Sequence, residues 1–358
     1  MLTVVLINSC AVILAYIAGR TSRKYWLKGS FGVLFLFLAL RYDYGNDYNA
    51  YHQSFLEINQ PGVSNSPSEY LYFEPGWVLL CYLFEPFGFF AMIAVLALFN
   101  CFIYYRFTIN YVPPTYFWLA VFLYVFDPGF MLTHSSAMRQ SIAIGLFIYS
   151  IDFLVKKKAL HYCLCISFAA LFHASALILL PIYLLGLFSW KINYVMAMVI
   201  FLLFLSMYLF GENLSPYLIQ FLGNRFSRYE IYLDQPAVLG TGFGIIAYSL
   251  LFGFILFSAR AQTADCTLLI KLLSVSFILS AMGLFVMMLG RVGLYFTPAA
   301  IAVFPGVLFN TKNSFTKCAV SSLLIFMTAH AFFIFFHSEI YKDSFAEYKT
   351  IFSAQEFR

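Results

Sequence analysis

Long stretches of apolar residues dominate the chain and are separated by short polar segments. A bilayer crossing needs about 20 mostly apolar residues, and about 17 suffice. Such runs lie at residues 2–19, 25–40, 87–106, 112–128, 138–155, 192–210, 243–259, 267–289, 292–309 and 315–336. The tract at 160–188 is interrupted by His173 and predicts a pair of short helices or a re-entrant hairpin. Residues 75–84 are too short to cross and predict a re-entrant or interfacial helix.

This pattern predicts an all-α, polytopic integral membrane protein with about ten to twelve transmembrane helices in a single domain, 1–358. A membrane β-barrel would instead alternate apolar and polar residues. Composition supports the helical prediction, because 62% of residues are hydrophobic and 10% are charged, against roughly 25% charged in soluble domains. These values exclude a cytosolic enzyme, a disordered tail and a disulfide-stapled secreted domain.

The charges around the first apolar run predict the orientation of the chain. Four basic residues follow that run, namely Arg20, Arg23, Lys24 and Lys28. A cleavable signal peptide has its basic residues before the apolar core, so we expect this helix to be retained. The positive-inside rule places the four in the cytoplasm and Met1 outside. If the following apolar runs cross the membrane in alternating directions, most basic residues lie inside and nearly all acidic residues lie outside. Both termini then lie on the outer side.

Two large outer segments follow from this map, at 41–74 and 211–242, with a shorter outer turn at 127–139. The inner loops are short and basic. We therefore expect any chemistry to lie on the outer face.

Five arginines on the outer side break the positive-inside bias: Arg41, Arg139, Arg225, Arg228 and Arg291. A charge at membrane depth is costly, which makes such a residue a candidate for function. The guanidinium is permanently charged and binds phosphate in a bidentate manner. We expect a cationic pocket for a lipid-linked diphosphate. Snorkelling, or pairing with the outer acids, is the alternative explanation.

Three acids flank the first outer segment: Asp43, Asp47 and Glu74. A sugar hydroxyl that attacks an anomeric carbon must lose a proton, and Asp47 or Glu74 is a candidate acceptor. The alternatives are turn hydrogen bonds for the two aspartates and a helix cap or an arginine partner for Glu74. Gly45 is expected to turn the loop with a positive φ.

His173 and His134 are further candidate bases, although a buried histidine is more often a hydrogen-bonded core residue. The seven cysteines lie in or beside apolar runs without metal-site spacing and are expected to be small core residues. No metal, P-loop, dinucleotide or serine-hydrolase motif occurs. We therefore expect a metal-independent reaction without a cofactor. The modest net charge of +5 argues against a nucleic-acid partner.

The segment RYDYGNDYNAYHQSF, followed by EPGW, resembles the EpsG-like, or Wzy-type, family of bacterial polysaccharide (O-antigen) polymerases. Short motifs of that family recur in the same order over most of the chain. The matching residues are Arg41, Gly45, Asp47, Tyr48, Tyr51, Glu74, Gly76, Arg139, Gln140, Ala143, Phe172, His173, Ser175, Arg291, Tyr295 and Phe296.

The resemblance implies a multi-pass protein of the bacterial inner membrane with a periplasmic active face. It implies a fold similar to lipid-dependent (GT-C-like) glycosyltransferases and O-antigen ligases. The implied activity joins oligosaccharide repeat units carried on undecaprenyl diphosphate, in O-antigen or exopolysaccharide synthesis. A chain-length-regulating membrane protein is a further expected partner.

Within that activity, Arg139 and Arg291 are expected to bind the diphosphate and stabilise its developing charge, together with Arg41 and Arg225. Asp47, Glu74 or His173 orients or deprotonates the acceptor hydroxyl. The residues expected to contact sugars are Tyr48, Tyr51, Gln140 and Tyr295.

Two other functions remain open at this point. A flippase or transporter for lipid-linked oligosaccharides would place charges along a path open to both sides. An O-antigen ligase would pass finished polymer to a different lipid acceptor.

Overall fold

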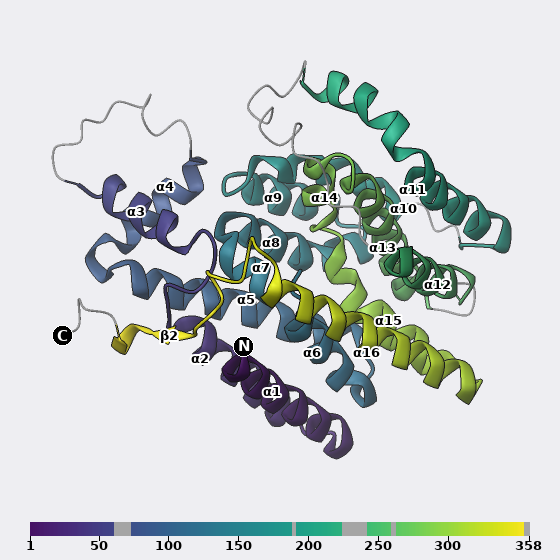
Figure 1. Cartoon of the computed structure of the whole chain (residues 1–358), viewed down its shortest axis with the longest axis horizontal. Coiled ribbons are helices and arrows are strands. Elements are labelled where there is room, and N and C mark those ends of the chain that lie inside the picture. Colours follow the sequence, from purple (N-terminus) through teal and green to yellow (C-terminus); the bar gives the residue numbers. More distant parts are fainter. Residues whose placement is uncertain (61–72, 188–190, 224–241, 259–262, 354–358) are drawn as a thin grey trace. The chain divides into compact units, whose positions relative to one another are not determined.

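The computed structural model describes residues 1–60, 73–187, 191–223, 242–258 and 263–353 of the chain (Figure 1). Most of these residues are helical. The α-helices are α1 (Leu2–Thr21), α2 (Lys24–Ala39), α3 (Tyr48–Ile58), α4 (Pro75–Phe84), α5 (Phe89–Tyr111), α6 (Phe117–Phe126), α7 (Met131–Ser136), α8 (Met138–Val155), α9 (Ala159–Ala170), α10 (Tyr183–Leu187), α11 (Tyr194–Gly223), α12 (Gly242–Ser258), α13 (Ala264–Gly283), α14 (Met287–Gly293), α15 (Ala300–Asn310) and α16 (Ser314–His337).

Short 3₁₀ turns and two very short strands complete the described elements. The 3₁₀ turns are η1 (Glu85–Phe87), η2 (Pro114–Tyr116), η3 (Ala174–Ile182), η6 (Thr297–Ala299) and η7 (Ile351–Ser353). Strand β1 (Arg41–Tyr42) pairs antiparallel with β2 (Lys349–Thr350), with Arg41 opposite Thr350.

Six of the described helices are long and apolar enough to cross a membrane: α1, α5, α8, α13, α16 and the Tyr194–Leu214 part of α11. A seventh span results if Met287–Gly293 and Thr297–Asn310, which are bent by 42°, form one crossing. The chain is therefore an all-α polytopic membrane protein, and this predicted fold class is confirmed.

The apolar runs predict ten to twelve crossings, whereas six or seven helices of the described chain meet the length criterion. Proline and turns explain part of the difference, and α2 and α12 are one or two residues shorter than the criterion. The run at 112–128 becomes a helix over Pro114–Phe126, which starts at a proline and stops at Asp127 before Pro128. The tract at 160–188 divides into helices over Ala159–Ala170 and Ala174–Leu187, with His173 between them.

The two large segments that are predicted to lie outside, 41–74 and 211–242, contain more helix than the sequence indicates. Helix α3 lies inside 41–74, and α11 continues to Gly223, well beyond residue 210. The remainder of both segments, 61–72 and 224–241, falls outside the described residues.

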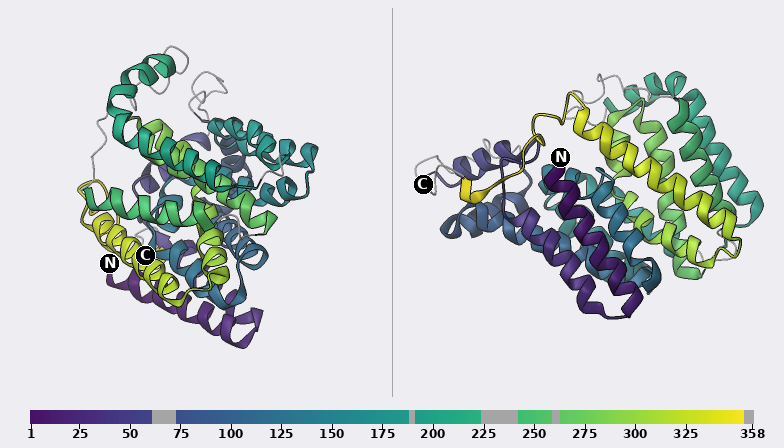
Figure 2. Two further views of the ribbon diagram at one scale, coloured as in Figure 1. Left: turned by 90° about the vertical axis from the view of Figure 1, so that its right-hand side faces the viewer. Right: turned by 60° about the horizontal axis from the view of Figure 1, so that its bottom comes forward.

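The described contacts divide the chain into two units. Unit 1 comprises Met1–Leu184 and Thr328–Arg358, and unit 2 comprises Leu185–Met327. In unit 1, α1 and α2 lie side by side as an antiparallel pair (Figure 2), and α5 packs against both α2 and α8. In unit 2, α13 packs against α11, α14 and α15. The chain thus leaves unit 1 after α9 and η3 and returns to it within α16.

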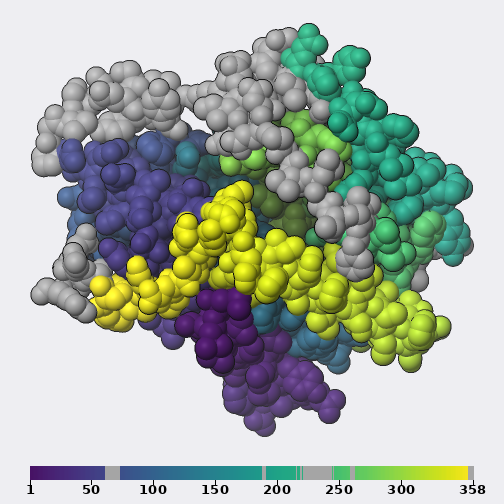
Figure 3. All heavy atoms as spheres, viewed as in Figure 1, coloured from purple at the N-terminus to yellow at the C-terminus, as the bar shows by residue number. Residues whose placement is uncertain are grey.

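The returning C-terminal segment covers the loop that follows α2. It is drawn in yellow in Figure 3, on the surface of unit 1. Tyr348 stacks on Phe37 with ring centroids 4.5 Å apart and donates its hydroxyl hydrogen to the Phe37 carbonyl at 2.7 Å. The Gly45 amide donates to the Ser344 carbonyl at 3.2 Å. The C-terminal segment therefore holds the loop between α2 and α3, although the paired residues lie more than 290 positions apart in the sequence. We call this loop, residues 40–47, the first motif loop.

Candidate functional site

The start of α4 is pressed against the turn that follows α9. The Gly76 amide donates to the Leu171 carbonyl at 2.8 Å. A Cβ at position 76 would lie 2.7 Å from that carbonyl oxygen, so only glycine fits this approach. Glu74 is the N-cap residue of α4, and Pro75 occupies the first helical position, where its missing N–H costs nothing. This contact brings Glu74 next to His173.

The Glu74 carboxylate joins three elements of unit 1. Its Oε2 accepts a hydrogen bond from Arg139 Nη1, on the first turn of α8, at 2.5 Å. Its Oε1 lies 3.5 Å from His173 Nδ1, an ion-pair distance without good hydrogen-bond geometry. The same Oε1 accepts a long hydrogen bond of 3.4 Å from the Ala174 amide. We call Glu74, Arg139 and His173 the carboxylate cluster.

The carboxylate cluster is charged and reachable from outside the protein. Burial alone raises the pKa of Glu74, but the neighbouring His173 imidazole and the charge of Arg139 outweigh it and lower the pKa to about 2. Glu74 is therefore ionised at neutral pH. The exposed fractions of the three side chains are 17% for Glu74, 22% for His173 and 24% for Arg139. A ligand can thus reach all three.

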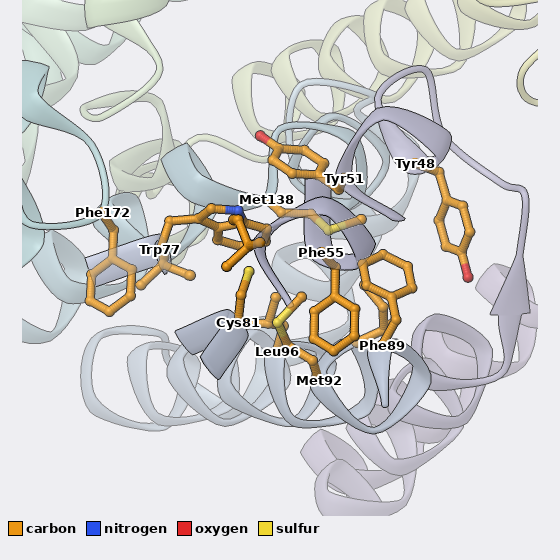
Figure 4. Close-up of a cluster of buried hydrophobic side chains, with 13 residues drawn as sticks. Tyr48, Tyr51, Phe55, Trp77, Cys81, Phe89, Met92, Leu96, Met138 and Phe172 are labelled. Atoms are coloured by element: carbon orange, nitrogen blue, oxygen red, sulfur yellow. The ribbon is translucent and has the colours of Figure 1, made fainter. Parts of the chain in front are cut away.

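Aromatic rings form one wall of the carboxylate cluster. The Arg139 guanidinium carbon lies 5.2 Å from the Phe73 ring centroid and 5.9 Å from that of Tyr51, within cation–π range. Tyr51 contacts Trp77 with centroids 4.9 Å apart. Both belong to a buried apolar cluster built from α3, α4, α5 and α8, which Figure 4 shows. This buried cluster supports both the start of α4 and the Arg139 side chain.

Asp47 lies close to this wall. It is the N-cap residue of α3 and is exposed. The charge of Asp47 acts on the Tyr51 hydroxyl, so the two side chains are near each other. Gly45, two residues before Asp47, has a φ of 132°, which confirms the expected positive φ.

Arg41 takes a different position from Arg139, although both lie in unit 1. It is 4% exposed. Its Nη1 donates to the Leu38 carbonyl at 3.2 Å and its Nη2 to the Ser135 carbonyl at 3.0 Å. Its guanidinium also lies 5.9 Å from the ring centroid of Tyr48. The structure thus does not place Arg41 in the carboxylate cluster.

The other predicted site residues are distributed as follows. Tyr48, Gln140 and Tyr295 are buried, at 0%, 6% and 0% exposure, so none presents a free ring face or amide to a sugar in this conformation. Arg291 is exposed at the last turn of α14, in unit 2. Arg225, together with Arg228, lies outside the described residues.

A match to a family model covers most of the chain. The model of the EpsG family matches residues 24–350. The chain belongs to the EpsG family. A comparison with curated proteins gave no match, and neither did a comparison with solved structures. The family match includes every member of the carboxylate cluster and also the C-terminal strand β2.

Some residues around the site of this EpsG-family chain have no clear signal in the sequence. The Leu171 carbonyl that receives α4 is a backbone group in an apolar tract. Tyr348 and Ser344, which hold the first motif loop, lie in the polar, aromatic segment after the last apolar run. The tyrosine and phenylalanine residues of this segment are the one feature of its sequence that indicates packing.

The described part of this EpsG-family chain contains no group of three or more His, Cys, Asp and Glu side chains that could hold a metal ion.

Proposed function

We propose that this EpsG-family protein is a polysaccharide polymerase that joins lipid-diphosphate-linked oligosaccharide repeat units by glycosyl transfer. Family membership favours this activity. The single structural observation behind it is that one ionised carboxylate, Glu74, holds both a cation and an imidazole at a partly exposed site. A lipid diphosphate leaving group needs the cation, and a sugar hydroxyl nucleophile needs the base.

Arg139 is the proposed ligand of the donor diphosphate. One of its terminal nitrogens donates to Glu74 Oε2, and Tyr51 is a second hydrogen-bond partner of its guanidinium. A guanidinium has five N–H donors, so donors remain for phosphate oxygens. The Arg139 charge stabilises the negative charge that develops as the diphosphate leaves. Arg291 lies in unit 2, and its role as a diphosphate ligand stays a prediction from the sequence.

His173 is the proposed general base. A carboxylate with a pKa near 2 is a weak base, so Glu74 suits the orientation of His173 and Arg139 better than proton removal. Glu74 faces His173 Nδ1, which leaves Nε2 as the nitrogen that accepts the proton. The carboxylate then stabilises the resulting imidazolium, as carboxylate–histidine pairs do in other enzymes.

The proposed reaction is a single displacement at the anomeric carbon of the donor. The acceptor hydroxyl oxygen forms a bond to the anomeric carbon of the donor while that carbon's bond to the phosphate oxygen breaks. The bonding electron pair leaves with the lipid diphosphate beside Arg139, and the hydroxyl proton moves to His173. A single in-line step inverts the anomeric centre.

Tyr51 and Asp47 are the proposed sugar contacts. Tyr51 lies beside the Arg139 guanidinium, and Asp47 is exposed at the start of the same helix. Tyr48 and Gln140, in the same unit, are buried and are proposed to support this surface from beneath. We further propose that the site faces the periplasm and that the lipid carrier is undecaprenyl diphosphate.

Reconstitution tests the proposed activity. Purified protein in detergent or proteoliposomes is incubated with synthetic lipid-diphosphate repeat units, without added metal or nucleotide, and the products are separated on a gel. A ladder of chain lengths is the expected result. Movement of intact substrate across proteoliposomes without elongation would support a flippase instead. Transfer of preformed polymer to a second lipid, with no ladder, would support a ligase.

A further inference from the structure

A small cavity lies in unit 1, at the point where strand β1, helix α5 and helix α7 meet. Its polar lining comes from Arg41, Asn100, His134, Ser135 and Ser141. Its volume is about 10 Å³, which is room for about one water molecule and too little for a phosphate group. None of these residues belongs to the carboxylate cluster.

Three side chains at the cavity have an unused hydrogen-bonding atom. Arg41 Nε, Asn100 Oδ1 and His134 Nε2 have no hydrogen-bond partner in the described part of the chain. The exposed fractions of these residues are 4%, 8% and 4%. Because a buried polar atom without a partner costs about 1–3 kcal/mol, native structures rarely leave three of them around one cavity.

The proton on His134 can be assigned from its neighbour. Burial lowers the pKa of His134 to about 4, so the imidazole is neutral at pH 7 and carries one ring hydrogen. Its Nδ1 lies 3.2 Å from the hydroxyl of Tyr104, which is 1% exposed. If Nδ1 carried the hydrogen, the Tyr104 hydroxyl hydrogen would be left buried. The hydroxyl therefore donates to Nδ1, and His134 Nε2 carries the hydrogen.

The orientation of the Asn100 amide is also fixed. Ser141 donates its hydroxyl hydrogen to the Met138 carbonyl at 2.8 Å, so its oxygen accepts from Asn100 Nδ2 at 3.5 Å. The Asn100 oxygen is consequently the atom that is left for the cavity.

The residues that line the cavity thus have two donors without a partner, Arg41 Nε–H and His134 Nε2–H, and one such acceptor, Asn100 Oδ1. We infer that one water molecule is bound here, accepting from Arg41 and His134 and donating to Asn100. Three hydrogen bonds are typical of a buried water. An anion would face the Asn100 oxygen, which repels negative charge.

This water completes the hydrogen bonding of Arg41, whose two terminal nitrogens already donate to carbonyls of α2 and of α7. It ties the first motif loop to α5 and to α7, which leads directly into α8 and Arg139. The site exists whether or not the protein is a polymerase, so its test is separate from that of the proposed function.

An experimental structure of the wild-type protein at a resolution that shows ordered water tests this inference. The expected result is a density peak within hydrogen-bonding distance of all three atoms. An empty cavity, or direct pairing of the three side chains after they repack, would overturn it. A bromide soak followed by anomalous scattering is the control for an anion, and a bromide peak in the cavity would also overturn it.

A double-mutant cycle gives a second, independent measurement. Asn100→Leu and His134→Phe each remove one partner of the water, and unfolding is followed in detergent. Since the two side chains share the water, the double variant is expected to lose clearly less stability than the sum of the single losses. Strictly additive losses would contradict a shared water.

Discussion

Glu74 and Arg139, 65 residues apart in the chain, form an ion pair that fixes the first turn of α8 to the first turn of α4. A second ion pair, between Arg106 and Asp152, joins α5 to the opposite end of α8. The two pairs resemble each other chemically, but only the first has a histidine, His173, on the same carboxylate. The second pair is therefore a matched control for the first.

The first prediction concerns Glu74→Gln. The amide still accepts a hydrogen bond from Arg139, but it no longer stabilises an imidazolium on His173. We expect about a 100-fold slower elongation rate, in the range typical for general acid–base catalysis, with the protein still folded. The rate is measured from the gel ladder over time. The control Asp152→Asn is expected to elongate at close to the wild-type rate, and equal losses in both variants would contradict a catalytic role for Glu74.

The second prediction concerns stability and pH. The pKa of Glu74 is lowered from 4.5 to about 2 in the folded protein. Its ionised form therefore contributes stability above about pH 4.5, and this contribution is lost as the pH falls toward 2. Thermal unfolding of wild type and Glu74→Gln should show a Tm difference at pH 7 that shrinks between pH 4.5 and pH 2. A difference that stays constant across that range would show that the carboxylate charge is not its source.

The third prediction concerns Gly76→Ala. The new Cβ meets the Leu171 carbonyl oxygen at 2.7 Å, so α4 must move away from the turn that carries His173. We expect a loss of about 1–3 kcal/mol in unfolding free energy and a loss of elongation. Gly32→Ala is the control, because its Cβ meets nothing within 4 Å and alanine favours the helix. Similar behaviour of the two variants would refute the close contact at Gly76.

The apolar pattern predicts the helical membrane fold, because each crossing is a local property of about 20 residues. Fewer described helices reach the length of a crossing than there are apolar runs, in part because proline and short turns divide the runs, as at Pro114 and His173. The sequence predicts the same role, binding of the diphosphate, for Arg41 and Arg139. Their different surroundings depend on packing against distant segments, namely Ser135 for Arg41 and Glu74 for Arg139, which no local pattern encodes.

The fourth prediction concerns the C-terminal segment. Tyr348→Phe keeps the stack on Phe37 but removes the hydrogen bond to its carbonyl, so we expect a loss of about 1 kcal/mol in unfolding free energy. Tyr348→Ala removes both and is expected to cost about 3 kcal/mol or more, with weaker elongation because the loop at Gly45 loosens. Tyr82→Phe, at a residue that is 48% exposed, is the control and should leave stability unchanged. No loss from Tyr348→Ala would mean that the segment does not hold the loop.

The most direct measurement is elongation by Arg139→Gln in the reconstituted assay, beside Arg106→Gln. Arg139 is the proposed diphosphate ligand, so its loss should slow elongation by about 100- to 1,000-fold and leave single repeat units on the lipid, with the protein inserted and folded. Arg106→Gln loses the control ion pair and should give a ladder like that of wild type. A normal ladder from folded Arg139→Gln would contradict the account of the carboxylate cluster as the site of polymerisation.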